Sequence, residues 1–378
     1  MNNKTLGLFF SYGVGIGTWE KQGYLNRELK YYQALANQLG KVSFFTYQRP
    51  GLKGLRDRVS LTLISVFPKK QRIPNWLYVL LMPFLLKKEI KECDILKTNQ
   101  MSGALPAVLA KLIYRKKLVV RCGYEWLYTL QKANKPLWKK AVVYTLEYLA
   151  YKTANKIIFT SKADKGFAQK TFKIKESKIA LIPNYIDTDL FKPLSNITKE
   201  PNFVCYVGRL SKEKNVSALI EAISGLPQAK LYIAGGGPLK GELQKQVIDL
   251  GVKERVVFLG KVPNEHLPQL LNKCEVFALP SLYEGNPKAL LEAMACGLPC
   301  LASDIEGINE IIKHNQNGLL VAASKDEIRQ ALSLLFKDKA LSERLAKQAR
   351  ATLEESFSLK QIISKELNLF KAIYESAK

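Results

Sequence analysis

The sequence predicts an α/β protein made of two doubly wound, parallel-sheet domains with a cleft between them. Three observations predict this fold class. Short apolar segments of strand length alternate with longer segments whose apolar residues recur three or four positions apart, as in parallel sheets covered by helices. The length of 378 residues fits two domains, since a domain usually has about 100–200 residues. Residues 187–202 contain two prolines and no periodicity, which predicts a linker.

The first half alternates strands with helices. The predicted strands are short apolar segments: 5–10, 42–46, 95–98, 118–122, 156–160 and 178–182. The predicted helices have the helical apolar period: 26–39, 103–114, 136–153 and 162–171. We expect residues 1–190 to form an N-terminal domain.

The second half repeats this alternation and gives a C-terminal domain of residues 191–357. Its predicted strands are 203–207, 230–234, 256–259, 276–278 and 299–302. Its predicted helices are 218–225, 240–250, 266–272, 289–295, 308–312, 325–337 and 342–354. An amphipathic helix is expected at 359–377, within a C-terminal segment 358–378 that packs back on the N-terminal domain.

The charge is concentrated in the first half of the chain. Residues 1–200 hold 35 Lys and Arg against 13 Asp and Glu, whereas the remainder has a net charge of only +3 out of the total of +25. Such an excess attracts a polyanion, either nucleic acid or an anionic membrane surface. The six cysteines lie mostly in apolar segments without zinc or redox spacing, so we expect reduced thiols and no metal site.

No targeting or membrane-spanning segment is predicted. The N-terminus lacks the features of a signal peptide, and the apolar stretch 73–86 is shorter than the roughly 20 residues that span a bilayer. We therefore expect a cytoplasmic protein. Lys69, Lys70 and Arg72 precede this stretch, and Lys87 and Lys88 follow it. It fits either a helix in the membrane interface or an ordinary core helix with solvated ends.

Two glycine-rich turns are candidate phosphate-binding loops. The turn at Gly13, Gly15 and Gly17 and the turn Gly235–Gly237 follow predicted strands, but neither matches GxGxxG, and the chain has no GxxxxGK[ST] loop. These mismatches disfavour NAD-dependent enzymes and P-loop NTPases.

The segment from Ser281 to Gly297 indicates a ligand site more specifically than the two glycine-rich turns do. An apolar strand runs into a turn, and Pro287 is expected at the first position of a helix. The amides at a helix N-terminus bind anions such as a diphosphate. Glu284 in the turn and Glu292 in the helix are placed to accept hydrogen bonds from sugar and ribose hydroxyls.

A basic turn follows the first strand of the second half. Arg209 and Lys214 lie five residues apart on this strand-to-helix turn. An arginine provides forked donors and a lysine a mobile point charge, so together they can hold a diphosphate. They would neutralise negative charge as a nucleotide departs.

These motifs carry a family resemblance. The chain resembles retaining nucleotide-sugar glycosyltransferases of family 4 over about residues 180–325, where the order of its motifs matches. The matching runs are LIPNYIDTDLFKP, VGRL with a following EK, AGGGPL, EGNPKALLEAMACGLP and NGLLV. The resemblance implies the GT-B fold, with two Rossmann-like domains. It also implies a donor bound mainly by the C-terminal domain, an acceptor bound mainly by the N-terminal domain, and no metal cofactor.

The resemblance also assigns residues. Arg209, Lys214 and Glu284 would be the catalytic groups. The donor site would comprise Gly15, Gly208, Arg209, Lys214, Gly237, Glu284, Gly285, Asn286, Pro287, Leu290 and Glu292. Many family members have a histidine near the position of Gly123, and this chain has none before His266. Arg121, Tyr124 and Glu125 are the acceptor-side candidates that remain.

The sequence thus predicts a glycosyltransferase that moves a sugar from a nucleotide-diphosphate sugar to a glycan or lipid-linked acceptor. We expect it at the inner face of a membrane, in surface polysaccharide or glycolipid synthesis. An epimerase or a glycogen-synthase-like polymerase on the same fold is the enzymatic alternative. A nucleic-acid-binding protein is the alternative of another class, disfavoured because the chain lacks aromatic RNA-binding motifs, zinc spacings and a basic heptad helix.

Overall fold

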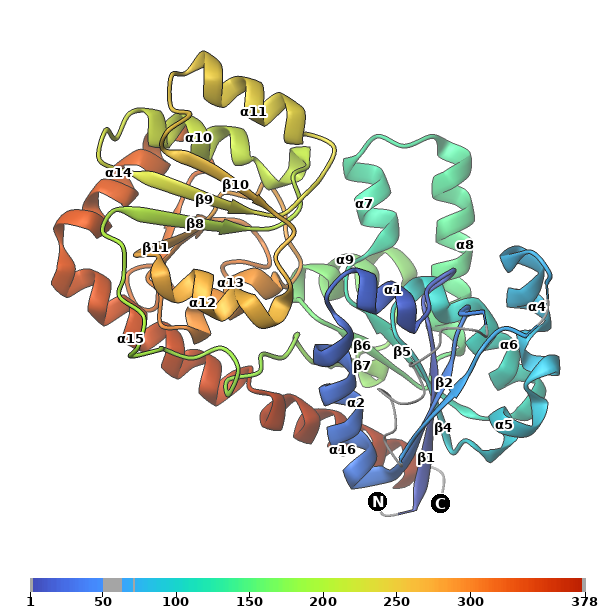
Figure 1. The fold of residues 1–378 in the computed structure, drawn as a ribbon. Coiled ribbons are helices and arrows are strands. Elements are labelled where there is room, and N and C mark those ends of the chain that lie inside the picture. Colours follow the sequence, from blue (N-terminus) through green and yellow to red (C-terminus); the bar gives the residue numbers. More distant parts are fainter. Residues whose placement is uncertain (1–2, 50–62, 71, 376–378) are drawn as a thin grey trace. The chain divides into compact units, whose positions relative to one another are not determined.

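A computed structural model of the chain describes residues 3–49, 63–70 and 72–375. The chain folds into two units. Unit 1 comprises Met1–Pro183 together with Ile363–Lys378, and unit 2 comprises Asn184–Ile362. Each unit contains one parallel sheet with helices around it (Figure 1). The predicted class of two doubly wound α/β domains is confirmed.

In the described part of unit 1, the sheet has seven strands in the order β3-β2-β1-β4-β5-β6-β7. Its strands are β1 (Lys4–Phe9), β2 (Gly40–Phe45), β3 (Ile64–Phe67), β4 (Ile95–Thr98), β5 (Lys117–Cys122), β6 (Lys156–Phe159) and β7 (Ile179–Leu181). The central strand β1 pairs with β2 on one side and β4 on the other, and Leu6 lies opposite both Val42 and Ile95. The strand order therefore reverses beside β1, the point at which open α/β sheets bind ligands.

The helices of unit 1 include four that the sequence did not assign firmly: α1, α4, α5 and α7. The helices within the described residues of this unit are α1 (Ile16–Lys21), α2 (Leu25–Leu39), α4 (Asn75–Leu85), α5 (Lys87–Glu92), α6 (Ala104–Tyr114), α7 (Trp126–Lys132), α8 (Leu137–Thr153) and α9 (Lys162–Phe172), with the C-terminal part of α16 (Leu359–Glu375). Helix α9 begins at a sequence signal, because the Ser161 side chain caps the amide of Asp164.

The apolar stretch 73–86 contains α4, which has one buried and one exposed face. Tyr78 and Met82 are buried, whereas Trp76 and Phe84 are mostly exposed. Lys69 is not one of the solvated cations that the core-helix alternative implies for the ends of this stretch. It is buried, and its Nζ donates to Asn75 Oδ1 at 2.8 Å. Within the described parts of the chain, no helix is long and apolar enough to cross a membrane.

A buried ion pair attaches α16 to the sheet of unit 1. Lys97 on β4 contacts Glu366 on α16, and both side chains are inaccessible to solvent. The hydroxyl of Tyr31 donates to the same carboxylate, and Lys97 Nζ lies 5.3 Å from the centre of the Tyr31 ring. Burial lowers the pKa of Lys97, and the Glu366 charge opposes this shift.

The sheet of unit 2 has six strands in the order β10-β9-β8-β11-β12-β13. Its strands are β8 (Phe203–Val207), β9 (Lys230–Ala234), β10 (Val256–Gly260), β11 (Val276–Leu279), β12 (Cys300–Ser303) and β13 (Leu319–Val321). Its helices are α10 (Val216–Ser224), α11 (Lys240–Asp249), α12 (Leu267–Lys273), α13 (Lys288–Ala295), α14 (Lys325–Lys337), α15 (Lys339–Ser356) and the first turn of α16.

Three local predictions in unit 2 differ from the structure. The predicted helix 308–312 is a series of turns, in which the Asn317 side chain accepts from the Lys313 amide at 2.7 Å. The segment 187–202, expected to be a linker, lies within unit 2 and buries Phe191 in its core. Pro287 precedes α13 as its N-cap and is not the first helical residue.

Candidate functional site

The candidate donor site is formed by the loops that follow three adjacent strands of unit 2. Strands β9, β8 and β11 are neighbours and parallel, so their following loops lie at the same edge of the sheet. The loop after β8 carries Arg209 and Lys214, the loop after β9 carries the glycine turn, and the loop after β11 carries Glu284. Ligands of open α/β sheets bind at this edge.

Lys214 and Glu284 form the centre of this site. Lys214 Nζ lies 2.5 Å from Glu284 Oε1, and the Ser281 hydroxyl donates to the same oxygen at 2.7 Å. The amide of Leu282 also donates to the carbonyl of Glu213 at 2.8 Å, which connects the two loops through their backbones. The structure therefore joins two predicted site residues that are 70 positions apart.

Arg209 lies on the exposed side of the loop after β8. Its carbonyl accepts a hydrogen bond from the Tyr206 hydroxyl at 2.9 Å. Burial, reinforced by the charges of Glu284 and Glu213, raises the pKa of Tyr206, so this hydroxyl remains a donor. A Cβ at Gly208 would lie 2.5 Å from the same hydroxyl. The hydrogen bond from Tyr206 therefore fixes the backbone at Arg209, while the Arg209 side chain faces solvent.

The glycine turn after β9 packs directly against the loop after β8. The amide of Gly208 donates to Ala234 and the amide of Leu210 donates to Gly236, each at 3.0 Å. Gly235 has a φ of 151°, and a Cβ there would lie 1.8 Å from the Gly208 carbonyl oxygen. A Cβ at Gly237 would lie 2.2 Å from the carbonyl oxygen of Leu210. Only glycine permits this approach of the two loops.

The segment between Glu284 and α13 is fixed by polar contacts. Asn286 is buried, and its Oδ1 accepts from the Asn184 amide at 2.9 Å. The Asn184 side chain in turn donates to the Asn286 carbonyl at 2.8 Å. The carbonyls of Glu284 and Gly285 lie against Gly307, where a Cβ would approach each oxygen to 2.3 Å. These contacts set the path of the loop before the helix.

The two predicted donor-site residues on α13 are buried. Leu290 is fully buried in the core of unit 2, which leaves only its backbone for the phosphate contact that the resemblance implies. Glu292 is 4% exposed, and its Oε1 accepts from Asn264 Nδ2 at 2.8 Å. Asn264 is a contact that sequence reasoning missed, because no spacing relates it to Glu292.

The predicted donor contact in unit 1, Gly15, precedes α1. Its amide donates to Thr18 Oγ1 at 3.2 Å, and a Cβ there would lie 2.7 Å from Gln48 Oε1. The same Gln48 oxygen accepts from the amide of Gly17 at 3.1 Å. Glycine is thus needed for a tight loop after β1.

The three acceptor-side candidates of unit 1 differ in exposure. The amide of Arg121 donates to Thr98 Oγ1 at 2.9 Å, and its side chain is half-buried. Tyr124 is 52% exposed. Glu125 is fully buried and occupies the residue before α7, where its side chain makes no capping hydrogen bond. Of these three, Tyr124 presents the largest exposed fraction to a ligand.

Glu125 belongs to a buried polar cluster. Its carboxylate accepts from the Tyr151 hydroxyl at 2.5 Å, and its amide donates to Asp164 at 3.0 Å. Glu147 accepts from the amides of Trp126 and its neighbour at the start of α7. Burial raises the pKa of Glu125, and the nearby Glu147 charge raises it further. Sequence reasoning missed Glu147, because a single acid within a helix carries no signal for such a contact.

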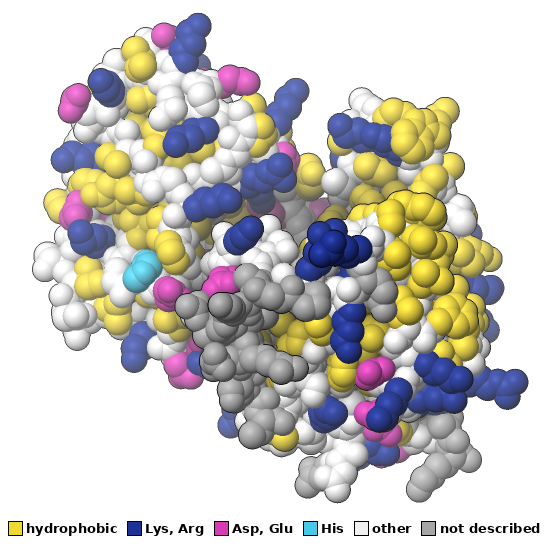
Figure 2. All heavy atoms as spheres, turned by 45° about the vertical axis from the view of Figure 1, so that its right-hand side comes forward, with side chains coloured by type: hydrophobic (Ala, Val, Ile, Leu, Met, Phe, Trp, Pro, Cys, Tyr) yellow, Lys and Arg dark blue, Asp and Glu magenta, His cyan; other side chains and the backbone are white. Residues whose placement is uncertain are grey.

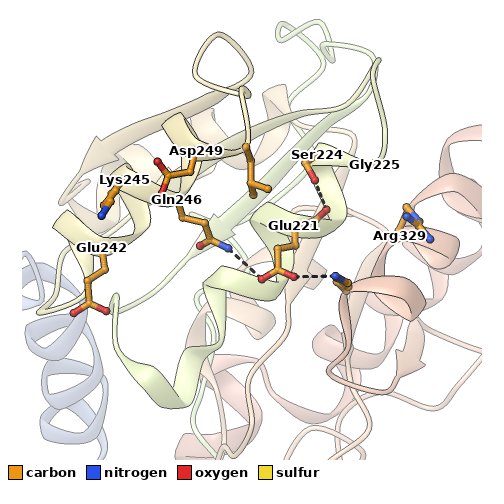
Figure 3. Close-up of a pocket in the computed structure, with 10 residues that line it drawn as sticks. Glu221, Ser224, Gly225, Glu242, Lys245, Gln246, Asp249 and Arg329 are labelled. Atoms are coloured by element: carbon orange, nitrogen blue, oxygen red, sulfur yellow. Dashed lines mark hydrogen bonds and ion pairs between the residues drawn. The ribbon is translucent and has the colours of Figure 1, made fainter.

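A cavity of about 500 Å³ lies elsewhere on unit 2 (Figure 3). It is lined by the last turn of α10 and by α11 and α14, and it includes none of the predicted site residues. Glu221 accepts from Gln246 at 3.2 Å and lies 3.5 Å from Lys325 Nζ, so charged side chains in this cavity compensate one another. Among the described residues, no group of three or more His, Cys, Asp or Glu could hold a metal ion.

Comparisons with known proteins identify relatives over both units. The family model of the glycosyl transferases group 1 matches residues 187–352, and that of glycosyltransferase family 4 matches residues 30–190. A UDP-Gal:alpha-D-GlcNAc-diphosphoundecaprenol alpha-1,3-galactosyltransferase of Escherichia coli is 30% identical over 306 residues, which are 76% of each chain. An uncharacterized glycosyltransferase of Methanocaldococcus jannaschii is 30% identical over 62% of this chain and 64% of its own, slightly under two thirds.

A third relative covers more of the chain. An N,N'-diacetylbacillosaminyl-diphospho-undecaprenol alpha-1,3-N-acetylgalactosaminyltransferase of Campylobacter jejuni is 29% identical over 84% of this chain and 87% of its own. Among solved structures, Anabaena HepE in complex with UDP has a TM-score of 0.77 at 21% identity and covers 98% of this chain and 100% of its own. A sucrose-phosphate synthase of Thermosynechococcus elongatus has a TM-score of 0.81 at 19% identity over 99% and 100%. These structures share the fold.

Proposed function

Because the chain belongs to the group 1 glycosyltransferases with the GT-B fold, we propose that it transfers a sugar from a nucleotide-diphosphate sugar to a hydroxyl of a glycan or lipid-linked acceptor, with retention at the anomeric carbon. The names of the Escherichia coli and Campylobacter jejuni relatives specify sugars transferred to diphospho-undecaprenol carriers, and HepE was solved with UDP. These names support a lipid-linked acceptor and a nucleotide-linked donor.

The contact between Lys214 and Glu284 carries the proposal. Lys214 and Glu284 compensate each other's charge, and their side chains are 21% and 9% exposed. A diphosphate bound at this edge attracts Lys214 more strongly than one carboxylate does, because it carries more negative charge. Glu284 then accepts hydrogen bonds from the sugar hydroxyls. The two loops therefore exchange an internal ion pair for contacts with the two halves of the donor.

Arg209 provides the second cation for the diphosphate. Its side chain is exposed at the same sheet edge, and its fork of donors suits phosphate oxygens. Gly208, Gly237, Gly285, Asn286 and Pro287 shape the donor loops, and Glu292 holds the ribose from α13. The family resemblance also assigns Gly15, in the loop after β1, to donor binding.

The proposed reaction is a front-face displacement. The acceptor hydroxyl oxygen forms the new bond to the anomeric carbon on the face from which the diphosphate leaves. The bond from that carbon to the phosphate oxygen breaks, and its electron pair remains on the phosphate. The same oxygen takes the acceptor proton. Arg209 and Lys214 stabilise the charge that develops on the diphosphate. Glu284 positions the sugar, since a single carboxylate lacks the two-carboxylate geometry of retaining hydrolases.

Nucleotide binding tests this proposal. Thermal unfolding is measured with UDP, GDP, ADP, CMP and dTDP, because a ligand at about 100 times its Kd adds roughly 2.7 kcal/mol of stability. We expect one nucleotide class to stabilise the wild type, and Arg209→Ala to reduce this shift. Lys347→Ala removes an exposed cation on α15, a helix that carries none of the donor-site residues; it is the matched control and should keep the shift. Failure of every nucleotide to stabilise the chain would contradict the proposed donor site.

A further inference from the structure

Three helices of unit 1 form a layer with an unusually apolar outer surface. Helix α4 packs against α6, and α6 packs against both α8 and the sheet. On α4, Trp76, Leu80 and Phe84 recur every four residues and are 63%, 42% and 60% exposed. They form one stripe, because residues four apart lie on the same face of a helix. This stripe is opposite the buried face of α4.

Helix α8 has a matching stripe. Trp138, Val142 and Leu149 are exposed on one face, and Val143 and Ala150 are buried on the other. Leu112 and Ile113, at the end of α6, add exposed apolar surface on the helix between α4 and α8. Figure 2 shows hydrophobic side chains gathered over the lobe that contains these helices, with Lys and Arg beside them. We call this the α4–α6–α8 surface.

The charges of the α4–α6–α8 surface have one sign. Helices α4 and α6 contain no acidic residue, and the single acid of α8, Glu147, is buried. Lys139 and Lys140 lie at the start of α8, next to Trp138. An apolar surface with cations and without exposed acids on its helices is the pattern of an element that rests in a membrane interface.

A basic pocket lies beside this surface. It has a volume of about 530 Å³ and is lined by Lys87, Lys91, Ile113, Tyr114, Arg115 and Lys116. Four of these six side chains are cationic and none is acidic. Lys91 Nζ lies 5.8 Å from the centre of the Tyr114 ring, and the Tyr114 hydroxyl donates to the Pro83 carbonyl at 2.9 Å. The pocket wall is therefore connected to the end of α4.

We propose that the α4–α6–α8 surface docks on an anionic lipid bilayer and that the adjacent basic pocket receives the phosphate of a lipid headgroup. The apolar stripes enter the acyl boundary, and the cations remain at headgroup level. A nucleic acid would use the cations but would leave the aliphatic side chains of Leu80, Val142 and Leu149 exposed to water, whereas the acyl boundary of a bilayer covers them. This proposal rests on the proposed function and deepens it, because an enzyme with a lipid-linked acceptor has to reach that acceptor at a bilayer.

Vesicle flotation tests the docking surface. The full chain is mixed with vesicles of phosphatidylcholine alone or of phosphatidylcholine and phosphatidylglycerol in equal parts, and we expect binding to the anionic vesicles. The triple variant Trp76→Gln, Phe84→Gln, Trp138→Gln replaces exposed side chains only, and should bind at least about tenfold more weakly. The matched control on unit 2 is Ile248→Gln with Lys245→Gln, both exposed, and it should bind as the wild type does.

A second comparison tests the pocket. Each basic residue near an anionic surface contributes about fivefold to partitioning. Lys87→Gln with Arg115→Asn should weaken binding more than Lys139→Gln with Lys140→Gln, although both remove two charges. Asparagine is chosen because Arg115 has a φ of 55°, which asparagine tolerates. Equal losses of vesicle binding in the two double variants would overturn the headgroup role of the pocket and indicate a diffuse electrostatic attraction.

Other outcomes separate this proposal from the proposed function. Absence of wild-type binding to anionic vesicles would overturn the docking surface. A wild-type dimer that the triple variant converts to a monomer in solution would assign the surface to a second copy of the chain and would also overturn it. Nucleotide-induced stabilisation is measured on the same variants. If no nucleotide stabilises the wild type but the wild type still binds anionic vesicles, the result contradicts the donor site and supports the docking surface.

Discussion

The buried pair of Lys97 and Glu366 gives a prediction with a calculable magnitude. Replacing Glu366 by Leu leaves a lysine that is 0% exposed without its counter-ion, and the charge of Arg121 disfavours its protonated form further. Removal of one partner of a buried pair costs about 3–5 kcal/mol of unfolding free energy. The Lys97→Met variant leaves Glu366 buried and should cost a similar amount.

The double variant separates the pair from its surroundings. Lys97→Met with Glu366→Leu removes both buried charges of the pair, and its main loss is the hydrogen bond that the Tyr31 hydroxyl donates to Glu366. Loss of a hydrogen bond to a charged group costs about 1.5–3 kcal/mol. The double variant should therefore be more stable than either single variant, although simple addition of the single costs predicts about 6–10 kcal/mol.

Urea unfolding followed by tryptophan fluorescence measures these costs. All four tryptophans lie in unit 1, and Trp19 is buried, so the signal reports on the unit that contains the pair. Burial lowers the pKa of Lys97, so the unfolded state binds more protons than the folded state at pH values just below the ordinary lysine pKa. Glu366→Leu removes the charge that opposes this lowering, so the pKa of Lys97 falls further in the variant and the penalty of the substitution should shrink as the pH rises. Additive costs, or single variants within about 1 kcal/mol of the wild type, would refute the reasoning.

Three further outcomes are expected. Lys214→Ala should lower glycosyl transfer by about a hundredfold or more while far-ultraviolet circular dichroism stays unchanged, and turnover equal to the wild type would exclude a role for this cation at the diphosphate. Gly235→Ala should lower the free energy of unfolding by more than about 3 kcal/mol in urea titration, whereas Gly241→Ala, whose Cβ meets no atom within 4 Å, should be neutral or stabilising. Burial raises the pKa of Glu125, so the folded state keeps a proton that the unfolded state loses, and stability from this group falls as pH rises above the ordinary Glu range. Glu125→Gln should therefore gain stability relative to the wild type between acidic and neutral pH, and parallel pH profiles of the two proteins would contradict this.

Elements with a strong period and a local cap could be predicted from the sequence. Helix α14 has the predicted bounds, because its apolar period is regular and the Ser324 side chain caps the amide of Glu327. Strand β9 also has the predicted bounds. Helix α7 was missed because its first amides are satisfied by Glu147 from another helix. The predicted helix 308–312 was wrong because the Asn317 side chain satisfies the local backbone in its place.

The centre of the candidate site followed from topology. Two motifs after neighbouring parallel strands must lie at one sheet edge, which explains the meeting of Lys214 and Glu284. The burial of Glu292 against Asn264 could not be predicted, since helical spacing gives a face but not the side chain opposite it. The burial of Glu125 was missed for the same reason, because Tyr151 and Asp164 come from later elements.

The division of the chain has a consequence for its synthesis. Unit 2 is a continuous insertion between the parts of unit 1, since the chain leaves unit 1 after Pro183 and returns to it at Ile363. A ribosome therefore releases all of unit 2 before the helix that neutralises Lys97 exists. Until α16 is synthesised, Lys97 in the N-terminal part of unit 1 lacks the carboxylate of Glu366. We therefore expect the N-terminal half to be the part that needs chaperones during synthesis. A nonsense mutation that removes α16 should destabilise this half more than unit 2.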